Sequence, residues 1–146
     1  MIYFDAAYIA KCYLNEPGAE PVRKLAQGTQ GVCSSELGRL EFACAVQRHR
    51  REGHINAREA RQALANFKQD EESGVWHWLP ITSALIGQVW EWVNSLPKEV
   101  FLRAGDAIHL GCAREHGFRE IYTSDRHMLG GARHFGLVGI DVLELG

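Results

Sequence analysis

Apolar residues along the chain alternate between two spacings, one typical of helices and one of strands. Short runs rich in β-branched or aromatic residues predict strands. Longer segments with apolar residues three or four positions apart predict helices. The predicted strands are residues 2–4, 32–33, 75–79, 120–123 and 138–143, and the predicted helices are residues 6–14, 20–27, 36–51, 56–72, 84–95, 103–116 and 126–134.

The first fifteen residues organise this pattern. Ile2, Tyr3 and Phe4 form a strand that ends at Asp5, and an apolar helix follows directly. Because strands and helices then alternate to the end of the chain, we expect an α/β fold: a three-layer α/β/α arrangement with a mostly parallel central sheet. No linker or repeat divides the sequence, so residues 1–146 are predicted to form a single domain.

Composition narrows the class of protein. A hydrophobic fraction of 46% predicts a packed core, and a net charge of −2 indicates neither an acidic tail nor a strongly basic nucleic-acid binder. No apolar run reaches the roughly 20 residues of a membrane span, and the N-terminus lacks a signal-peptide pattern, so we expect a cytoplasmic protein with no membrane partner. The four scattered cysteines, Cys12, Cys33, Cys44 and Cys112, are expected to be reduced core residues.

Four acidic residues lie at positions where a catalytic or metal-binding role is expected. Asp5 and Asp125 each follow a strand, whereas Glu41 and Asp106 lie on helix faces that are otherwise apolar. Each also has an ordinary explanation: the aspartates suit helix N-termini, and Glu41 could pair with an arginine. Strand ends and the helix starts that follow them share one rim of a parallel sheet, so we expect the four carboxylates to converge there. Such a cluster requires protons or a cation, and oxygen ligands favour Mg²⁺ or Mn²⁺.

Four motifs carry a resemblance that covers nearly the whole chain. They are Ile-Tyr-Phe-Asp5, Ser35-Glu-Leu-Gly-Arg-Leu-Glu41, Leu102-Arg-Ala-Gly-Asp-Ala-Ile-His109 and Tyr122-Thr-Ser-Asp125. In this order and at these separations they resemble the PIN domain, and within it the VapC-type toxins of bacterial toxin–antitoxin pairs.

The resemblance implies a Mg²⁺- or Mn²⁺-dependent endoribonuclease that hydrolyses RNA phosphodiester bonds and leaves a 3′-hydroxyl and a 5′-phosphate. Asp5, Glu41, Asp106 and Asp125 match the family's catalytic and metal-binding acids, and Thr123 and Ser124 match a supporting hydroxyl position. It also implies an RNA substrate, a small cognate antitoxin and a homodimer. One departure is that Ala6 and Ala7 replace the hydroxyl or amide residues that commonly follow the first aspartate. A catalytically weak PIN-fold module that binds RNA or protein is therefore the alternative.

Other candidates have two interpretations each. Arg48, Arg50 and Arg51 could follow an RNA backbone or simply form a solvated helix end. His109, one helical turn after Asp106, could contact phosphate or act as an acid, or be a packed bystander. The four tryptophans fit core and subunit interface better than base stacking. Cys112 and His116 share a helical spacing, but no second pair completes a zinc site.

Overall fold

The computed structural model describes residues 1–145, and its elements follow the predicted order. The strands are β1 (Ile2–Tyr3), β2 (Val32–Ser35), β3 (Trp76–Leu79), β4 (Glu120–Tyr122) and β5 (Val138–Ile140). The helices are α1 (Ala6–Tyr13), α2 (Ala19–Gln27), α3 (Glu36–Arg51), α4 (Ala57–Glu72), α5 (Ser83–Asn94), α6 (Ala104–Glu115) and α7 (Arg126–Gly131), and a 3₁₀ helix follows at Ala132–Phe135.

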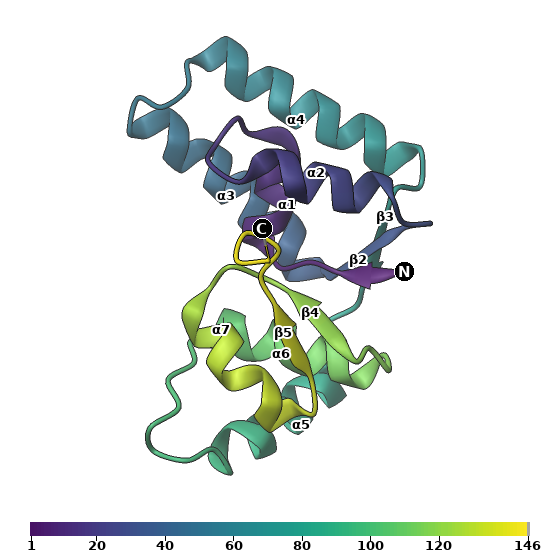
Figure 1. The fold of residues 1–146 in the computed structure, drawn as a ribbon, viewed down its shortest axis with the longest axis vertical. Helices are drawn as coiled ribbons and strands as arrows, with labels where there is room; N and C mark the ends of the chain where they lie inside the picture. The colour runs from purple at the N-terminus through teal and green to yellow at the C-terminus, as the bar shows by residue number, and fades with distance from the viewer. Residues whose placement is uncertain (146) are drawn as a thin grey trace.

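Every strand pairing is parallel, as predicted. One ladder joins β1, β2 and β3 in that order, and a second joins β4 to β5. A single parallel bridge between Phe4 and Tyr122 connects the two ladders beside β1. The chain therefore places its strands in the order β3, β2, β1, β4, β5, with β1 at the centre (Figure 1).

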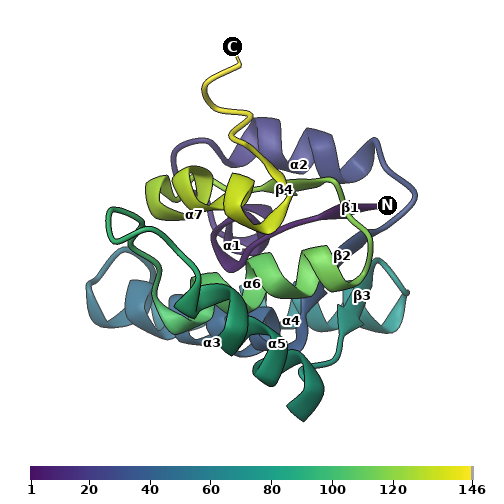
Figure 2. The same cartoon turned by 90° about the horizontal axis from the view of Figure 1, so that it is seen from below.

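Two hydrophobic clusters lie on opposite sides of the sheet, because consecutive strand residues point to opposite faces. Tyr3 belongs to a cluster with residues of α5, α6 and the C-terminal elements. Phe4 belongs to a second cluster with residues of α1, α2, α3 and α4. Figure 2 shows the helices above and below the strands, which confirms the three-layer α/β/α prediction.

Local signals explain most helix boundaries. The Asn56 side chain accepts a hydrogen bond from the Glu59 amide, and the Glu59 carboxylate accepts one from the Asn56 amide, so a capping box begins α4. Thr82 is the N-cap of α5, and its side chain accepts a hydrogen bond from the Leu85 amide. The helix therefore begins at Ser83, one residue before the predicted start. The strands at residues 120–123 and 138–143 are shorter than predicted, because pairing between β4 and β5 ends at Tyr122 and Ile140.

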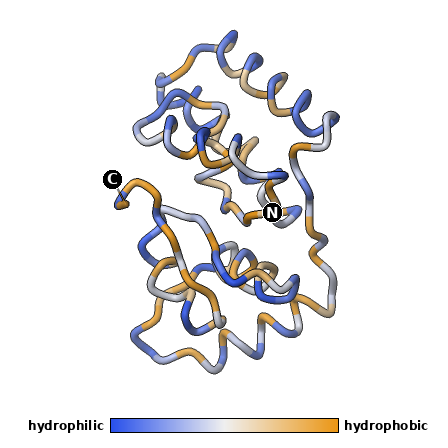
Figure 3. The backbone as a smooth tube through the Cα atoms, turned by 45° about the vertical axis from the view of Figure 1, so that its right-hand side comes forward, coloured by the Kyte–Doolittle hydropathy of each residue, from blue (hydrophilic) through white to orange (hydrophobic). Residues whose placement is uncertain are grey.

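Two burial predictions were wrong. Val93 lies one helical turn after Val89 and was expected to face inward with Leu85 and Val89, but Val93 is exposed whereas those two residues are buried. Cys44 was expected in the core, but it is exposed on α3, on the side of a pocket described below. Figure 3 shows how hydrophilic and hydrophobic residues alternate along the helices at the surface. No helix within residues 1–145 combines the length and the apolar character needed to cross a membrane.

Candidate active site

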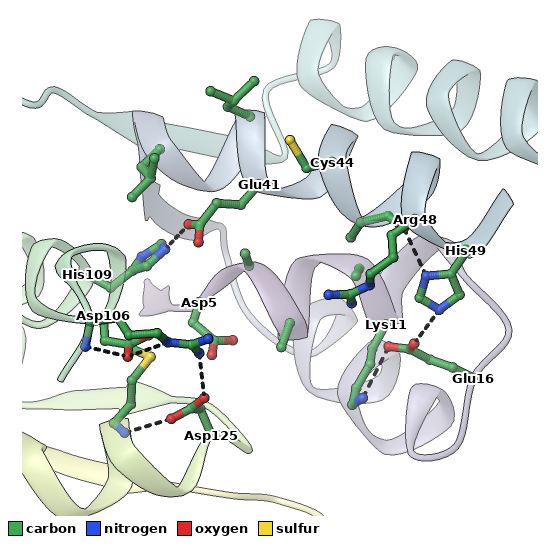
Figure 4. Close-up of a pocket in the computed structure, with 18 of the residues that line it drawn as sticks. Asp5, Lys11, Glu16, Glu41, Cys44, Arg48, His49, Asp106, His109 and Asp125 are labelled. Atoms are coloured by element: carbon green, nitrogen blue, oxygen red, sulfur yellow. Dashed lines mark hydrogen bonds and ion pairs between the residues drawn. The ribbon is translucent and has the colours of Figure 1, made fainter. Parts of the chain in front are cut away.

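Four carboxylates from distant parts of the chain line one pocket of about 640 Å³. Asp5 follows β1, Asp125 follows β4, Asp106 lies in the first turn of α6, and Glu41 lies in the second turn of α3 (Figure 4). The parallel sheet explains this arrangement, since its strands all end at one edge. The structure thus brings together all four acids that the sequence singled out.

Asp5 forms the floor of the pocket and is almost completely buried. Its Oδ1 accepts a hydrogen bond from the Tyr8 amide at 3.0 Å, and its Oδ2 accepts one from the Thr123 hydroxyl. Burial raises the pKa of Asp5, more than the hydrogen bonds from Thr123 and Tyr8 lower it. A buried carboxylate of this kind needs a proton or a cation to balance its charge.

Thr123 links two of the acids. Its Oγ1 donates to Asp5 and accepts a hydrogen bond from the Asp125 amide at 3.0 Å. Ser124, the other expected supporting residue, lies elsewhere: its hydroxyl donates to Asp141 Oδ1 at 3.0 Å. Asp141 also accepts from the Tyr8 hydroxyl at 2.9 Å. Ser124 therefore joins the end of β4 to the end of β5, and Asp141 extends the contact to α1, away from the four carboxylates.

Arg103 stands between Asp106 and Asp125. Its Nε lies 3.5 Å from Asp106 Oδ2, and its Nη2 lies 3.6 Å from Asp125 Oδ2. The Arg103 amide also donates to Asp106 Oδ2 at 3.1 Å, as part of the cap of α6. The positive charge of the Arg103 guanidinium is thus shared between the carboxylates of Asp106 and Asp125. Arg103 was not among the residues expected at the site, although its place three residues before Asp106 at a helix start is a visible signal.

Glu41 pairs with a histidine rather than with an arginine. Its Oε1 lies 2.6 Å from His109 Nε2, and His109 is itself buried. His109 is therefore a buried partner of Glu41. It lies behind the carboxylates rather than in the open part of the pocket (Figure 4).

The far end of the same pocket is basic. Lys11, Arg48, His49 and Arg51 line it, whereas Arg50 is exposed and is not part of the lining. Glu16 lies between two of these residues, 3.2 Å from Lys11 Nζ and 3.2 Å from His49 Nε2. The Arg48 guanidinium projects into the pocket between this end and Asp5 (Figure 4). One continuous pocket thus joins an acidic end to a basic end.

The donor set suits a hard divalent cation, because the acidic end offers the carboxylate oxygens of Asp5, Glu41, Asp106 and Asp125. In residues 1–145, however, no three side chains of the metal-binding types stand close enough to hold a metal ion. Glu41 is held by His109, and Arg103 lies between Asp106 and Asp125. Binding of a cation would need Arg103 to move away.

The fold agrees with three solved structures. Mycobacterium tuberculosis VapC20, described as a sarcin-ricin loop cleaving toxin, has a TM-score of 0.70 at 20% identity, over 90% of this chain and 95% of that one. FitAB bound to an IR36 DNA fragment has a TM-score of 0.70 at 15% identity, over 97% and 94%. FitAcB from Neisseria gonorrhoeae has a TM-score of 0.65 at 15% identity, over 97% of both chains. At these identities the likeness establishes the fold alone.

Sequence comparison gives the family. No curated protein matches the chain significantly. The family model described as the PIN domain matches residues 2–130, which include β1 and the four carboxylates of the acidic end of the pocket. With the parallel sheet and the position of the acids at its edge, this match shows that the chain belongs to the PIN domain family.

Proposed function

We propose that the protein is a metal-dependent endoribonuclease and the toxin of a toxin–antitoxin pair. PIN domains are generally nucleases, and VapC20, which shares the fold, is described as cleaving the sarcin-ricin loop. The observation that carries the proposal is the convergence of Asp5, Glu41, Asp106 and Asp125 in one pocket, with Asp5 buried at its floor.

The acidic, basic and hydroxyl side chains at the site have separate parts in the proposed reaction. Asp5, Glu41, Asp106 and Asp125 would hold Mg²⁺ or Mn²⁺, which supplies an activated water and charge compensation for the phosphate. Thr123 fixes the orientation of Asp5 through its hydroxyl. Arg48, Arg51 and Lys11 offer positive charge to the RNA backbone along the same pocket. Hydrolysis joins the water oxygen to phosphorus and breaks the bond to the 3′ oxygen.

The test compares two substitutions that each remove one negative charge. Asp106→Asn keeps an oxygen that can accept from the Arg103 amide, so the fold should persist. RNA cleavage should fall by at least about 100-fold, since loss of an outer partner alone commonly costs 10- to 100-fold. Asp70→Asn is the control, because Asp70 accepts from the Tyr13 hydroxyl outside this pocket. Cleavage by Asp106→Asn at the wild-type rate would refute the role of Asp106.

The toxin assignment adds a partner. We propose a small antitoxin that covers the pocket and places a basic side chain among the carboxylates, as Arg103 does within the chain. Purification of the tagged protein from its native host should recover such a peptide in a stable complex. Recovery of the protein without any small partner, under conditions that preserve complexes, would count against the toxin assignment.

A second candidate function has one observation in its favour. Ala6 and Ala7 line the pocket and provide no hydroxyl beside Asp5, which is consistent with a weakly active module that binds RNA or protein. A titration with Mn²⁺ separates the two. A nuclease site should raise the melting temperature as Mn²⁺ is added, because the ion binds the folded state. No change in melting temperature, together with retained RNA binding, would favour the binding module.

A further inference from the structure

A buried series of hydrogen bonds connects the core to Glu41. The Ser35 amide donates to the Tyr3 hydroxyl at 3.1 Å. That hydroxyl lies 2.9 Å from His109 Nδ1, and His109 Nε2 lies 2.6 Å from Glu41 Oε1. Tyr3 and His109 are both almost completely buried, whereas Glu41 is about one-third exposed. The series therefore runs from the interior of the sheet to the wall of the pocket.

With a neutral His109 imidazole, the chemistry at the two ends of the series fixes the direction of every hydrogen bond. The Ser35 amide can only donate, and an ionised Glu41 carboxylate can only accept. Tyr3 therefore accepts from Ser35 and donates its own proton to His109 Nδ1. His109 is left with its proton on Nε2, which it donates to Glu41. Burial raises the pKa of Tyr3 well above its ordinary value, so the phenol keeps the proton that this direction requires.

Glu41 has little else to hold it in place. Within residues 1–145 its only hydrogen bond is the one from His109. Its other oxygen, Oε2, lies beside Gly105, where an added Cβ would stand 3.4 Å from it. One oxygen is thus fixed from behind by the imidazole, and the other faces the first turn of α6, where Asp106 lies.

We propose that Tyr3 and His109 are positioning residues that hold Glu41 in the orientation needed to share a divalent cation with Asp106. The proposal rests on the proposed metal-dependent function. The imidazole occupies one Glu41 oxygen and leaves the second free toward α6. Loss of the imidazole allows the side chain to adopt other rotamers, so fewer molecules present it correctly and the ion binds more weakly.

The first experiment uses the metal-free protein. Nitrogen-15 NMR of the imidazoles in the full chain should show His109 as the Nε2-protonated tautomer. Tyr3→Phe removes the donor to Nδ1 and should convert His109 to a mixture of tautomers. Tyr13→Phe is the matched control, because that hydroxyl also accepts one N–H, from Trp76, and donates to one carboxylate, that of Asp70. An Nδ1-protonated His109 in the wild type would overturn the proposed hydrogen-bond direction.

The second experiment measures Mn²⁺ binding by calorimetry, well below the melting temperature of each variant. His109→Leu should weaken binding by roughly 10- to 100-fold, as other losses of an outer partner do. His109→Gln should recover most of the affinity, because its amide can still donate to Glu41. Tyr3→Phe should lie between these two, and Tyr13→Phe should match the wild type. A merely structural role would lower the melting temperature and leave the dissociation constant unchanged.

The outcomes separate this proposal from the proposed function. If the wild type binds Mn²⁺ and cleaves RNA, and His109→Leu binds equally well or more tightly, the positioning role is wrong and the nuclease assignment stands. If the wild type binds no Mn²⁺, the proposed function fails, and the positioning role fails with it. Weaker binding by His109→Leu together with recovery by His109→Gln supports both.

Discussion

At the scale of single residues, the aspartates of the pocket serve two purposes at once. Asp5 accepts from the Tyr8 amide at the start of α1, and Asp125 accepts from the His127 and Met128 amides at the start of α7. Asp106 accepts from the Arg103 amide. The sequence presented capping and chemistry as competing explanations. They coexist, because a carboxylate has two oxygens and a helix that begins at the sheet edge faces the pocket.

The positions of these acids were predictable, but their partners were not. Strand ends and helix starts can be read from the sequence pattern, and they suffice to bring Asp5 and Asp125 to one edge. The contacts of Arg103 and of His109 depend on rotamers and on tertiary packing between elements far apart in the chain. No local pattern encodes them, so the sequence alone offered an arginine as the ordinary partner of Glu41 and did not point to His109.

Arg103 should compete with a divalent cation for Asp106 and Asp125. Its side chain is about two-thirds exposed, so its two ion pairs are worth about 1 kcal/mol together. Arg103→Gln should therefore bind Mn²⁺ about fivefold more tightly in calorimetry. Arg126→Gln is the control, because it removes the same charge from an exposed neighbour of Asp125. Equal affinity in both variants would show that Arg103 does not occupy the cation position.

Arg48 and Arg50 allow a matched test of whether RNA binds along the pocket. Arg48 lines the pocket, whereas Arg50, two residues later on α3, does not. Arg48→Ala should weaken binding of single-stranded RNA to a cleavage-inactive Asp106→Asn protein. It should also reduce the salt slope by about 0.7, as expected for one lost phosphate contact. Arg50→Ala should have the smaller effect on both quantities, and equal effects would show that RNA does not follow the pocket.

At the scale of elements, the Glu71 carboxylate joins α4 to two neighbouring elements, α3 and β3. Glu71 accepts from Trp78 Nε1 on β3 at 2.8 Å and pairs with Arg39 on α3 and with Lys68. Burial alone would raise the pKa of Glu71, but the hydrogen bonds from Lys68, Arg39 and Trp78 outweigh it, so the pKa is lowered. The ionised carboxylate thus stabilises the packing of α4 beside α3 and β3.

Glu71→Gln keeps an oxygen for Trp78 and removes the charge. Since the folded-state pKa lies below the unfolded value, the charge contributes its full stabilisation above pH 4.5. This contribution is lost as the pH falls through the folded-state pKa. The variant should therefore lose about 1 kcal/mol of unfolding free energy at pH 7 and almost nothing at the acidic end of a denaturant series. A pH-independent difference would contradict the ionic explanation.

Element boundaries show how far local signals extend. The capping box at Asn56 fixed the start of α4 correctly, because both hydrogen bonds lie within four residues. The ends of β4 and β5 were placed too late, since they depend on where two strands distant in sequence stop pairing. The inward face of α5 was partly misjudged for the same reason: its apolar residues surround much of the helix, and the partner α6 selects which flank is buried.

At the scale of the whole molecule, α5 leaves a row of apolar side chains uncovered. Ile86, Trp90 and Val93 follow a helical spacing and are exposed, with Trp90 about two-thirds exposed. The homodimer stays a prediction, and this row is the surface on which we expect a second copy to pack. Trp90→Glu should convert a dimer to a monomer in light scattering and keep the melting temperature of the fold.

Gln88→Glu is the control for that experiment, because it adds the same charge on another flank of α5. It should remain dimeric. A wild type that is monomeric at high concentration, or a Trp90→Glu variant that remains dimeric, would contradict the assignment of this surface. The sequence pattern indicated an interface for the tryptophans, but only the packing of α5 showed that Trp90 is the exposed one and Trp92 lies against the core.

The order of the acids along the chain has a consequence for fragments of the protein. Asp5 and Glu41 precede the segment that connects α5 to α6, and Asp106 and Asp125 follow it. A cut in this connection would divide the carboxylates two and two, and would also separate Glu41 from His109. Neither fragment could be an enzyme by itself, whereas reassociation along β1 and β4 would restore the complete set. The chain is thus suited to a split reporter, in which the proposed nuclease activity would appear only when two tethered halves meet.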